Sequence, residues 1–243
     1  MDNIFKYLFI LILCSALPLF GQNPDIDSLL ELGNKKIGEK NYNKALAEFE
    51  KVLRIDKTNE KAVTGKLNSL LYLEKINEAE NYINTQIALN EHEAIFYYGK
   101  GILLIYNKQF KKAVENFDMA IELDTGEKLK NIYISRGIAY ENMKLYDEAI
   151  DDLSTYLRYD KSNTNALYHR GFNYYLLENY KNAIDDFNAV IAIDKNHGYA
   201  YYNLGMSYYK NEDILNACKN FQLACQLNNI NACKMILTGC SKK

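Results

Sequence analysis

The sequence predicts an all-α fold, a solenoid of stacked helical hairpins. An alanine recurs with spacings of 34, 34, 36, 34 and 34 residues, at Ala45, Ala79, Ala113, Ala149, Ala183 and Ala217. A large apolar residue stands four residues after each one, at Phe49, Ile83, Phe117, Leu153, Phe187 and Phe221. Twelve residues before the alanines stand Gly33, Leu67, Gly101, Gly137, Gly171 and Gly205. Such a period is typical of hairpins that must stack to bury their apolar faces.

Each of these positions has a steric reason. A glycine on the first helix and an alanine on the second let the two helices cross closely, and the large apolar residue fills the space beside the crossing. The second repeat departs from this pattern, because Leu67 replaces the glycine and Glu80 and Gln86 stand where other repeats have aliphatic residues. We therefore expect its second helix to be the least well packed.

Taken in order, the hairpins are expected over about 26–59, 60–93, 94–129, 130–163, 164–197 and 198–231. The single spacing of 36 is explained by two extra residues in the loop at 124–127, where an insertion costs little. Gly239 lies thirty-four residues after Gly205, so 232–243 is expected to form a capping helix over the last apolar face. Because no segment resembles a linker, residues 22–243 are predicted to form one domain.

This pattern resembles the tetratricopeptide repeat (TPR) family, which has a small residue at position 8, an aromatic residue at 11, alanine at 20 and an aromatic residue at 24. The usual proline at position 32 and tryptophan at position 4 are absent. The resemblance implies a right-handed α-solenoid of six TPR-like hairpins and a C-terminal capping helix. It also implies a scaffold, a class with many different roles.

The N-terminus resembles a secretory signal. Lys6 precedes an apolar run, 7–20, that is too short to span a bilayer, and a cut after Gly21 would make 1–21 a signal peptide. Acylation of Cys14 is a less favoured alternative, because Leu13 is bulky where a lipoprotein signal needs a small residue. An uncleaved membrane anchor is the other alternative. Export to the periplasm or cell envelope, or secretion, is the leading prediction.

The four cysteines after this segment all lie near the C-terminus. An antiparallel helix pair that turns near Asn229 would place Cys225 opposite Cys233 and Cys218 opposite Cys240. In an exported chain this favours two disulfides, Cys218–Cys240 and Cys225–Cys233. Zinc binding is disfavoured because cysteines seven apart on a helix are poorly placed for one ion, and free buried thiols are the third possibility. The turn also resembles that of Sel1-like repeats, which supports the inner pair.

The composition excludes several functions. The net charge of −2 argues against nucleic acid as a partner. No phosphate-binding loop or nucleophile motif is present, and His92, His169 and His197 lie in different repeats. The recurring acid pairs, Asp151 with Asp152 and Asp185 with Asp186, are interpreted as a solvated helix face. We predict no enzyme activity, no cofactor, no metal and no small-molecule substrate.

The resemblance further implies that first helices line a concave face, with positions 2, 5, 9, 12 and 13 directed into it. Together with position 6, these positions give the predicted partner-binding residues: Tyr98, Ile134, Tyr168, His169, Phe172, Tyr175, Tyr199, Tyr202, Asn203 and Tyr209. Tyrosine suits such a surface because its apolar ring ends in a polar group. The lysine-rich clamp with which some members of the family hold a C-terminal carboxylate is absent.

The predicted function is a non-enzymatic, exported scaffold that binds a protein or peptide segment along this concave face in the bacterial cell envelope. A glycan or peptidoglycan receptor that uses the same tyrosines is the alternative, and an accessory subunit of an envelope enzyme complex is the third. Membrane contact is expected only indirectly, or through a lipid anchor if Cys14 is acylated.

Overall fold

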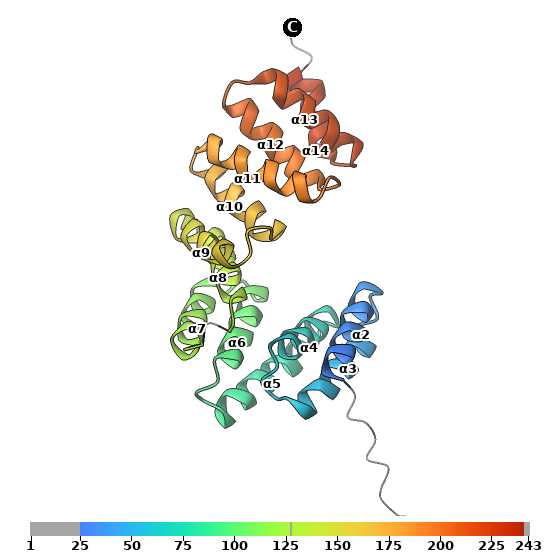
Figure 1. Ribbon diagram of the computed structural model, residues 1–243, viewed down its shortest axis with the longest axis vertical. Helices are drawn as coiled ribbons and strands as arrows, with labels where there is room; N and C mark the ends of the chain where they lie inside the picture. The colour runs from blue at the N-terminus through green and yellow to red at the C-terminus, as the bar shows by residue number, and fades with distance from the viewer. Residues whose placement is uncertain (1–24, 127, 241–243) are drawn as a thin grey trace, which may run out of the picture. The chain divides into compact units, whose positions relative to one another are not determined.

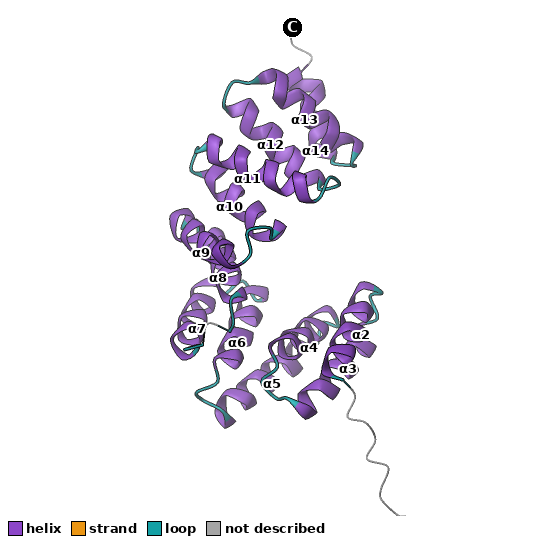
Figure 2. Cartoon of the chain, viewed as in Figure 1, coloured by secondary structure: helices purple, strands orange, loops and turns teal. Residues whose placement is uncertain are grey.

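The computed structural model describes residues 25–126 and 128–240, and all regular structure within these ranges is helical, as predicted (Figure 2). The predicted signal peptide, including Cys14 and Gly21, lies outside the described residues. The chain divides into two compact units, and the boundary in the sequence lies between Glu74 and Lys75. This boundary falls inside the predicted second repeat. The single domain over 22–243 stays a prediction, and the two units are described separately.

The N-terminal unit contains α2 (Ile26–Gly38), α3 (Tyr42–Ile55) and α4 (Glu60–Tyr72). Its core is centred on Phe49, which is fully buried. A Cβ atom added at Gly33 would lie 2.7 Å from the Phe49 ring, and one at Gly65 would lie 2.5 Å from it. The small residue of α4 is therefore Gly65, and Leu67, where the ladder predicts a glycine, is a fully buried core residue.

The C-terminal unit contains the remaining helices (Figure 1). They are α5 (Ile76–Leu89), α6 (Ala94–Tyr106), α7 (Phe110–Leu123), α8 (Asn131–Asn142), α9 (Tyr146–Tyr159), α10 (Thr164–Leu176), α11 (Tyr180–Ile193), α12 (Gly198–Lys210), α13 (Ile214–Gln226), α14 (Ile230–Met235) and the π-helix η1 (Ile236–Cys240). Helix α5 buries only Ala79 and Ile83, fewer residues than α3, α7, α9, α11 or α13. This agrees with the poor packing expected of that helix.

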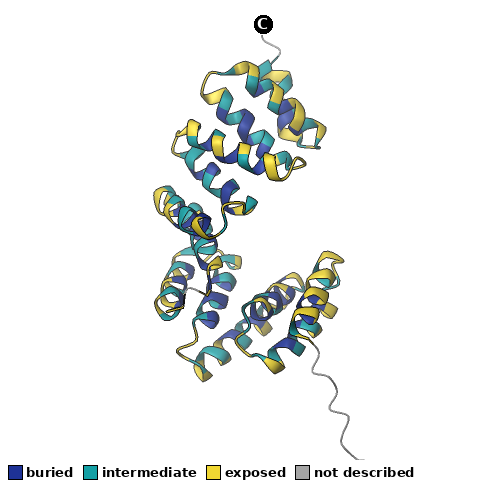
Figure 3. Cartoon of the chain, viewed as in Figure 1, coloured by how far each residue is buried: buried dark blue, intermediate teal, exposed yellow. Residues whose placement is uncertain are grey.

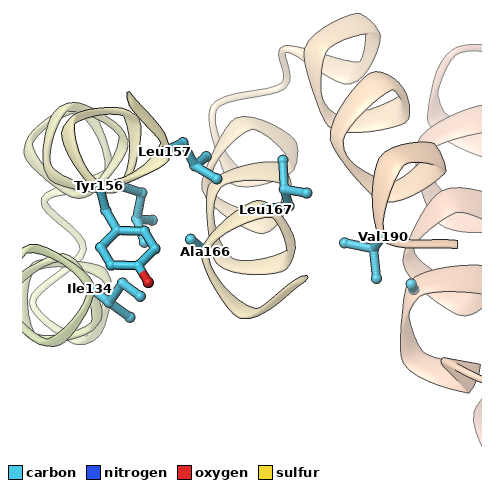
Figure 4. Close-up of a cluster of buried hydrophobic side chains, with 8 residues drawn as sticks. Ile134, Tyr156, Leu157, Ala166, Leu167 and Val190 are labelled. Carbon is cyan, nitrogen blue, oxygen red and sulfur yellow. The ribbon is translucent and has the colours of Figure 1, made fainter. Parts of the chain in front are cut away.

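The core of the C-terminal unit runs from one hairpin into the next (Figure 3). One cluster joins α8 to α12 and includes Ile134, Leu157, Leu167 and Val190 (Figure 4). Each hairpin therefore completes its burial only against its neighbours, which is the property that defines a solenoid.

The turns inside the hairpins share a conformation that the sequence pattern does not reveal. The second residue after the end of each first helix has a positive φ, at Lys40, Glu74, Lys108, Lys144, Glu178 and Glu212, with no glycine among them. After α10, the Glu178 N–H donates to the Tyr175 carbonyl at 3.0 Å and the Asn179 N–H to the Tyr174 carbonyl at 2.9 Å. These two bonds form a Schellman motif, so the turn is closed by backbone bonds.

The C-terminal cap is tied to α13 by both predicted disulfides. Cys218 pairs with Cys240 across a Cα–Cα distance of 5.8 Å, and Cys225 pairs with Cys233 across 4.9 Å. The cap begins with α14 and continues as η1. A π-helical turn takes more residues than an α-helical one, so it changes the direction of Cys240 relative to Cys233. The described part of the cap ends at Cys240.

Candidate functional site: an aromatic surface on the first helices

The first helices of the C-terminal unit lie on the inner side of the stack. Helix α6 contacts α8, α8 contacts α10, and α10 contacts α12. Among the described residues, the successive second helices α7, α9, α11 and α13 do not pack on one another to the same degree. Side chains on the free side of the first helices therefore face the same space, as the family resemblance implies.

Three predicted binding residues are instead part of the core, and the prediction is wrong for them. Tyr98 and Ile134 are 5% and 8% exposed, and Asn203 is also buried. The Tyr98 ring packs against Phe117, Ile134 belongs to the α8–α12 cluster, and Asn203 lies between α10 and α12. The repeat position gives the direction of a side chain, but neighbouring helices decide how much of it remains exposed.

Tyr168 on α10 is partly buried and held by its neighbours. Its hydroxyl accepts a hydrogen bond from Asn203 Nδ2 at 3.0 Å. Its ring centroid lies 5.2 Å from that of His197 and 5.9 Å from that of Phe187. Burial raises the pKa of the Tyr168 hydroxyl, and the Asn203 hydrogen bond opposes that rise. Tyr168 therefore presents a fixed, neutral ring at the edge of the surface.

His169 belongs to a polar network that joins α8 to α10. Its Nδ1 lies 3.0 Å from Glu141 Oε2, and the same oxygen accepts a hydrogen bond from Asn173 Nδ2 at 2.8 Å. Asn173 is fully buried, and its Oδ1 has no hydrogen-bond partner among the described residues. The network is thus largely internal, and His169 holds two first helices together. The sequence did not indicate Glu141 or Asn173, which lie in different repeats.

The predicted binding residues that keep part of their surface exposed lie on α10 and α12. Phe172, Tyr175 and Tyr202 are half-buried, and Tyr209 is 36% exposed. We call these four residues, with Tyr168, the aromatic surface. Tyr175 and Tyr202 are close enough to interact electrostatically, and the pKa of Tyr175 is raised mainly by burial. Tyr199 is more exposed, at 67%, and lies beside a loop.

Two arginine–aspartate pairs each join the two helices of one hairpin, one between α8 and α9 and one between α10, which carries part of this surface, and α11. Arg136 donates two hydrogen bonds, each of 2.7 Å, to Asp152 and a third to Asp118. Arg170 donates to Asp186 at 2.7 and 2.8 Å. Burial opposes the charge of Arg136, but the hydrogen bonds that it donates to its carboxylate partners hold its pKa above the ordinary value.

This geometry corrects the interpretation of the acid pairs. Asp152 and Asp186 are buried partners of arginines, and only Asp151 and Asp185 form the solvated face. Each arginine lies sixteen residues before its aspartate, on the other helix of the same hairpin. These carboxylates therefore join helices and leave no acid pair free for proton transfer.

The described residues contain no group of three histidine, cysteine or acidic side chains that could hold a metal ion. Over the same part of the chain, no helix is both long and apolar enough to cross a membrane. What the structure presents is a surface of aromatic rings on rigid helices. Stacked hairpins with such a surface define the class of helical-repeat scaffolds for protein–protein interaction.

Sequence comparison identifies the family within this class. Residues 26–59, 131–163, 164–197 and 198–231 match family models described as tetratricopeptide repeat, and together they make up more than half of the chain. The chain belongs to the tetratricopeptide repeat family. The matches do not include residues 60–130, which contain the irregular second repeat. The Sel1-like character of the last turn stays a prediction.

Individual proteins show weaker similarity. The curated relative dynein axonemal assembly factor 4 of Pongo pygmaeus is 27% identical over 117 residues, which are 46% of this chain. The match spans only 28% of the length of that relative. Among solved structures, YrrB, a TPR protein with an unusual peptide-binding site, aligns with a TM-score of 0.62 at 19% identity, over 78% of this chain and 97% of its own. PilW, a type IV pilus biogenesis factor, aligns with a TM-score of 0.70 at 16% identity, over 88% and 98%. These structures share the fold.

Proposed function

We propose that this protein is an exported, non-enzymatic scaffold that binds an extended protein segment along the aromatic surface of α10 and α12. The observation that carries the proposal is the set of partly exposed rings, Tyr168, Phe172, Tyr175, Tyr202 and Tyr209, on two packed helices. An ion pair joins α10 to α11, and a hydrogen bond joins α12 to α10. Rigid rings lose little conformational entropy on binding, which favours their use as anchors.

The surface also indicates the chemistry of the partner. Glu141, the acidic residue of the network that joins α8 to α10, already binds His169 and Asn173. Charge therefore contributes little to selection on this side of the helices. The expected partner segment presents aliphatic or aromatic side chains at intervals, with backbone groups that can bond to the tyrosine hydroxyls.

Export is the second part of the proposal. It is supported by the apolar N-terminal segment 7–20 and by the two disulfides of the cap, which are typical of oxidising compartments. A role in assembling an envelope complex is compatible with the biogenesis role of PilW, although the likeness to PilW concerns the fold alone. Fractionation of an expressing bacterium and N-terminal sequencing test this part. Cytosolic protein with an intact 1–21, in which Cys218, Cys225, Cys233 and Cys240 are free thiols, would contradict it.

The binding part is tested with peptides selected from a random display library against the folded protein. We expect Tyr175→Ala and Tyr209→Ala each to weaken the selected peptides about tenfold or more, because both remove a ring from the aromatic surface. The matched control is Tyr159→Ala on the second helix α9, where the ring is exposed to a similar degree, 40%. Calorimetry gives the Kd, and circular dichroism verifies the fold. Equal losses in all three variants would place the binding elsewhere.

A further inference from the structure

A pocket separate from the aromatic surface lies between two loops near the C-terminus. One wall comes from the loop that joins α11 to α12, and the other comes from the loop that joins α13 to α14. Its volume of about 750 Å³ is within the range of small-molecule sites in proteins. The loops approach closely at Gly198, where an added Cβ would lie 3.2 Å from the Leu227 Cβ. A larger residue at Gly198 would press on Leu227.

The pocket contains polar groups without partners in the protein. The side chains of Asn228, Asn231 and Lys234 line it and make no hydrogen bond within the described residues. His197 is different, because its Nδ1 accepts a hydrogen bond from the Ala200 N–H at 3.1 Å. The proton of the neutral ring therefore lies on Nε2, which can donate to a bound molecule. An asparagine amide both donates and accepts, as does a hydroxyl group, so this lining matches a ligand with several adjacent hydroxyls.

The other lining residues add an apolar surface and little net charge. Tyr199 and Ile230, at 67% and 70% exposed, are large apolar side chains at its wall. Asp194 and Lys234 carry opposite charges, so together they do not select for an anion or a cation. Amides beside an exposed aromatic ring suit a ring-shaped, neutral and polyhydroxylated molecule, which can place its C–H face on the tyrosine and its hydroxyls on the amides.

We propose that this pocket is a saccharide-binding site, with Asn228, Asn231 and His197 as hydrogen-bonding groups and Tyr199 as the stacking ring. Tyr199 then serves this pocket rather than the protein-binding surface for which the sequence suggested it. The site is distinct from the aromatic surface, because none of the five rings of that surface lines the pocket; the two are linked by the contact of the His197 ring with Tyr168. Its failure would leave the proposed protein-binding function untouched.

The experiment uses the full mature chain with its disulfides intact and two probes, chitotriose and maltotriose, which differ in acetamido groups. Two-dimensional ¹H–¹⁵N NMR follows the side-chain amides of Asn228 and Asn231, and calorimetry gives the Kd. We expect at least one probe to shift these amides at millimolar concentration. Tyr199→Ala should raise the Kd about tenfold and Asn231→Ala about fivefold, since each removes one contact.

The control is Tyr209→Ala, which removes an exposed ring from the same helix outside the pocket. It should leave saccharide affinity unchanged and weaken peptide binding, whereas Tyr199→Ala should do the reverse. Because Tyr199 and Asn231 are exposed, both variants are expected to keep the thermal midpoint of the wild type, and this is measured first. The absence of shifts with both probes, or equal saccharide affinity in wild type, Tyr199→Ala and Asn231→Ala, overturns the proposal.

Discussion

The close contact between Gly101 and Phe117 leads to a quantitative prediction. A Cβ atom at Gly101 on α6 would overlap the Phe117 ring, which is fully buried on α7 and cannot turn aside. Overpacking of this kind costs about 1–3 kcal/mol, and replacing a helical glycine with alanine returns up to about 1 kcal/mol. We therefore expect Gly101→Ala to destabilise the C-terminal unit by about 1–2 kcal/mol, or a fall of roughly 2–8 °C in Tm for a unit of this size.

The chain supplies its own control. At Gly137 an added Cβ would lie 3.1 Å from the branched Leu153 side chain, which yields more easily than a ring. Gly137→Ala should therefore change stability by less than about 0.5 kcal/mol, and Phe117→Leu should relieve the strain of Gly101→Ala. Urea unfolding of Gly101→Ala, Phe117→Leu and the variant with both changes measures the coupling free energy between the two positions. We expect it to exceed about 1 kcal/mol. Equal stability of Gly101→Ala and Gly137→Ala, or additive effects in the double variant, would refute the steric explanation.

Three further predictions concern stability. Arg170→Met should lower the free energy of unfolding by about 2–4 kcal/mol, because it leaves the buried Asp186 carboxylate unpaired. The double variant Arg170→Met with Asp186→Leu should recover most of this loss. A coupling free energy below about 0.5 kcal/mol between the two changes, measured by urea unfolding, would contradict the prediction. Glu178→Gly should stabilise the protein by about 0.5–1 kcal/mol, because Glu178 has a φ of 61°, which favours glycine. The control Asp151→Gly, within helix α9, should destabilise it. A lower Tm for Glu178→Gly would be inconsistent with the turn described. Replacing Cys218 and Cys240 with alanine should lower the free energy of unfolding by about 3 kcal/mol. This loss should be slightly larger than that from replacing Cys225 and Cys233, because the outer pair closes a longer loop. The reverse order of stability in thermal unfolding would argue against the loop-length explanation.

The fold could be predicted from the sequence because its determinants are local and repeated. Glycine and alanine at fixed positions describe a crossing between two adjacent helices, and the two cysteine pairs depend only on where one hairpin turns. At Leu67 the prediction of an irregular repeat was correct, but the small residue that replaces the missing glycine, Gly65, was not recognised. It packs on Phe49 of the preceding helix, so its role depends on a neighbouring hairpin.

The candidate site was less predictable, because exposure depends on several helices at once. Tyr98 and Asn203 were expected on the concave side, yet both are buried and each bonds to the neighbouring first helix. Asp186 looked solvated because its arginine partner lies on another helix. The pocket beside Tyr199 had no sequence signal, since two polar loops become a pocket only when the hairpin spacing places them side by side.

The covalent attachment of α14 and η1 has a consequence for association. In helical-repeat arrays a terminal helix can leave its own chain and dock in the same place on a second copy, which produces a swapped dimer. Here Cys233 and Cys240 are bonded to α13 of their own chain, at two points along the cap. Exchange at this end would require both bonds to be broken, so any molecule that joins this end must add to the surface of the cap and cannot replace it.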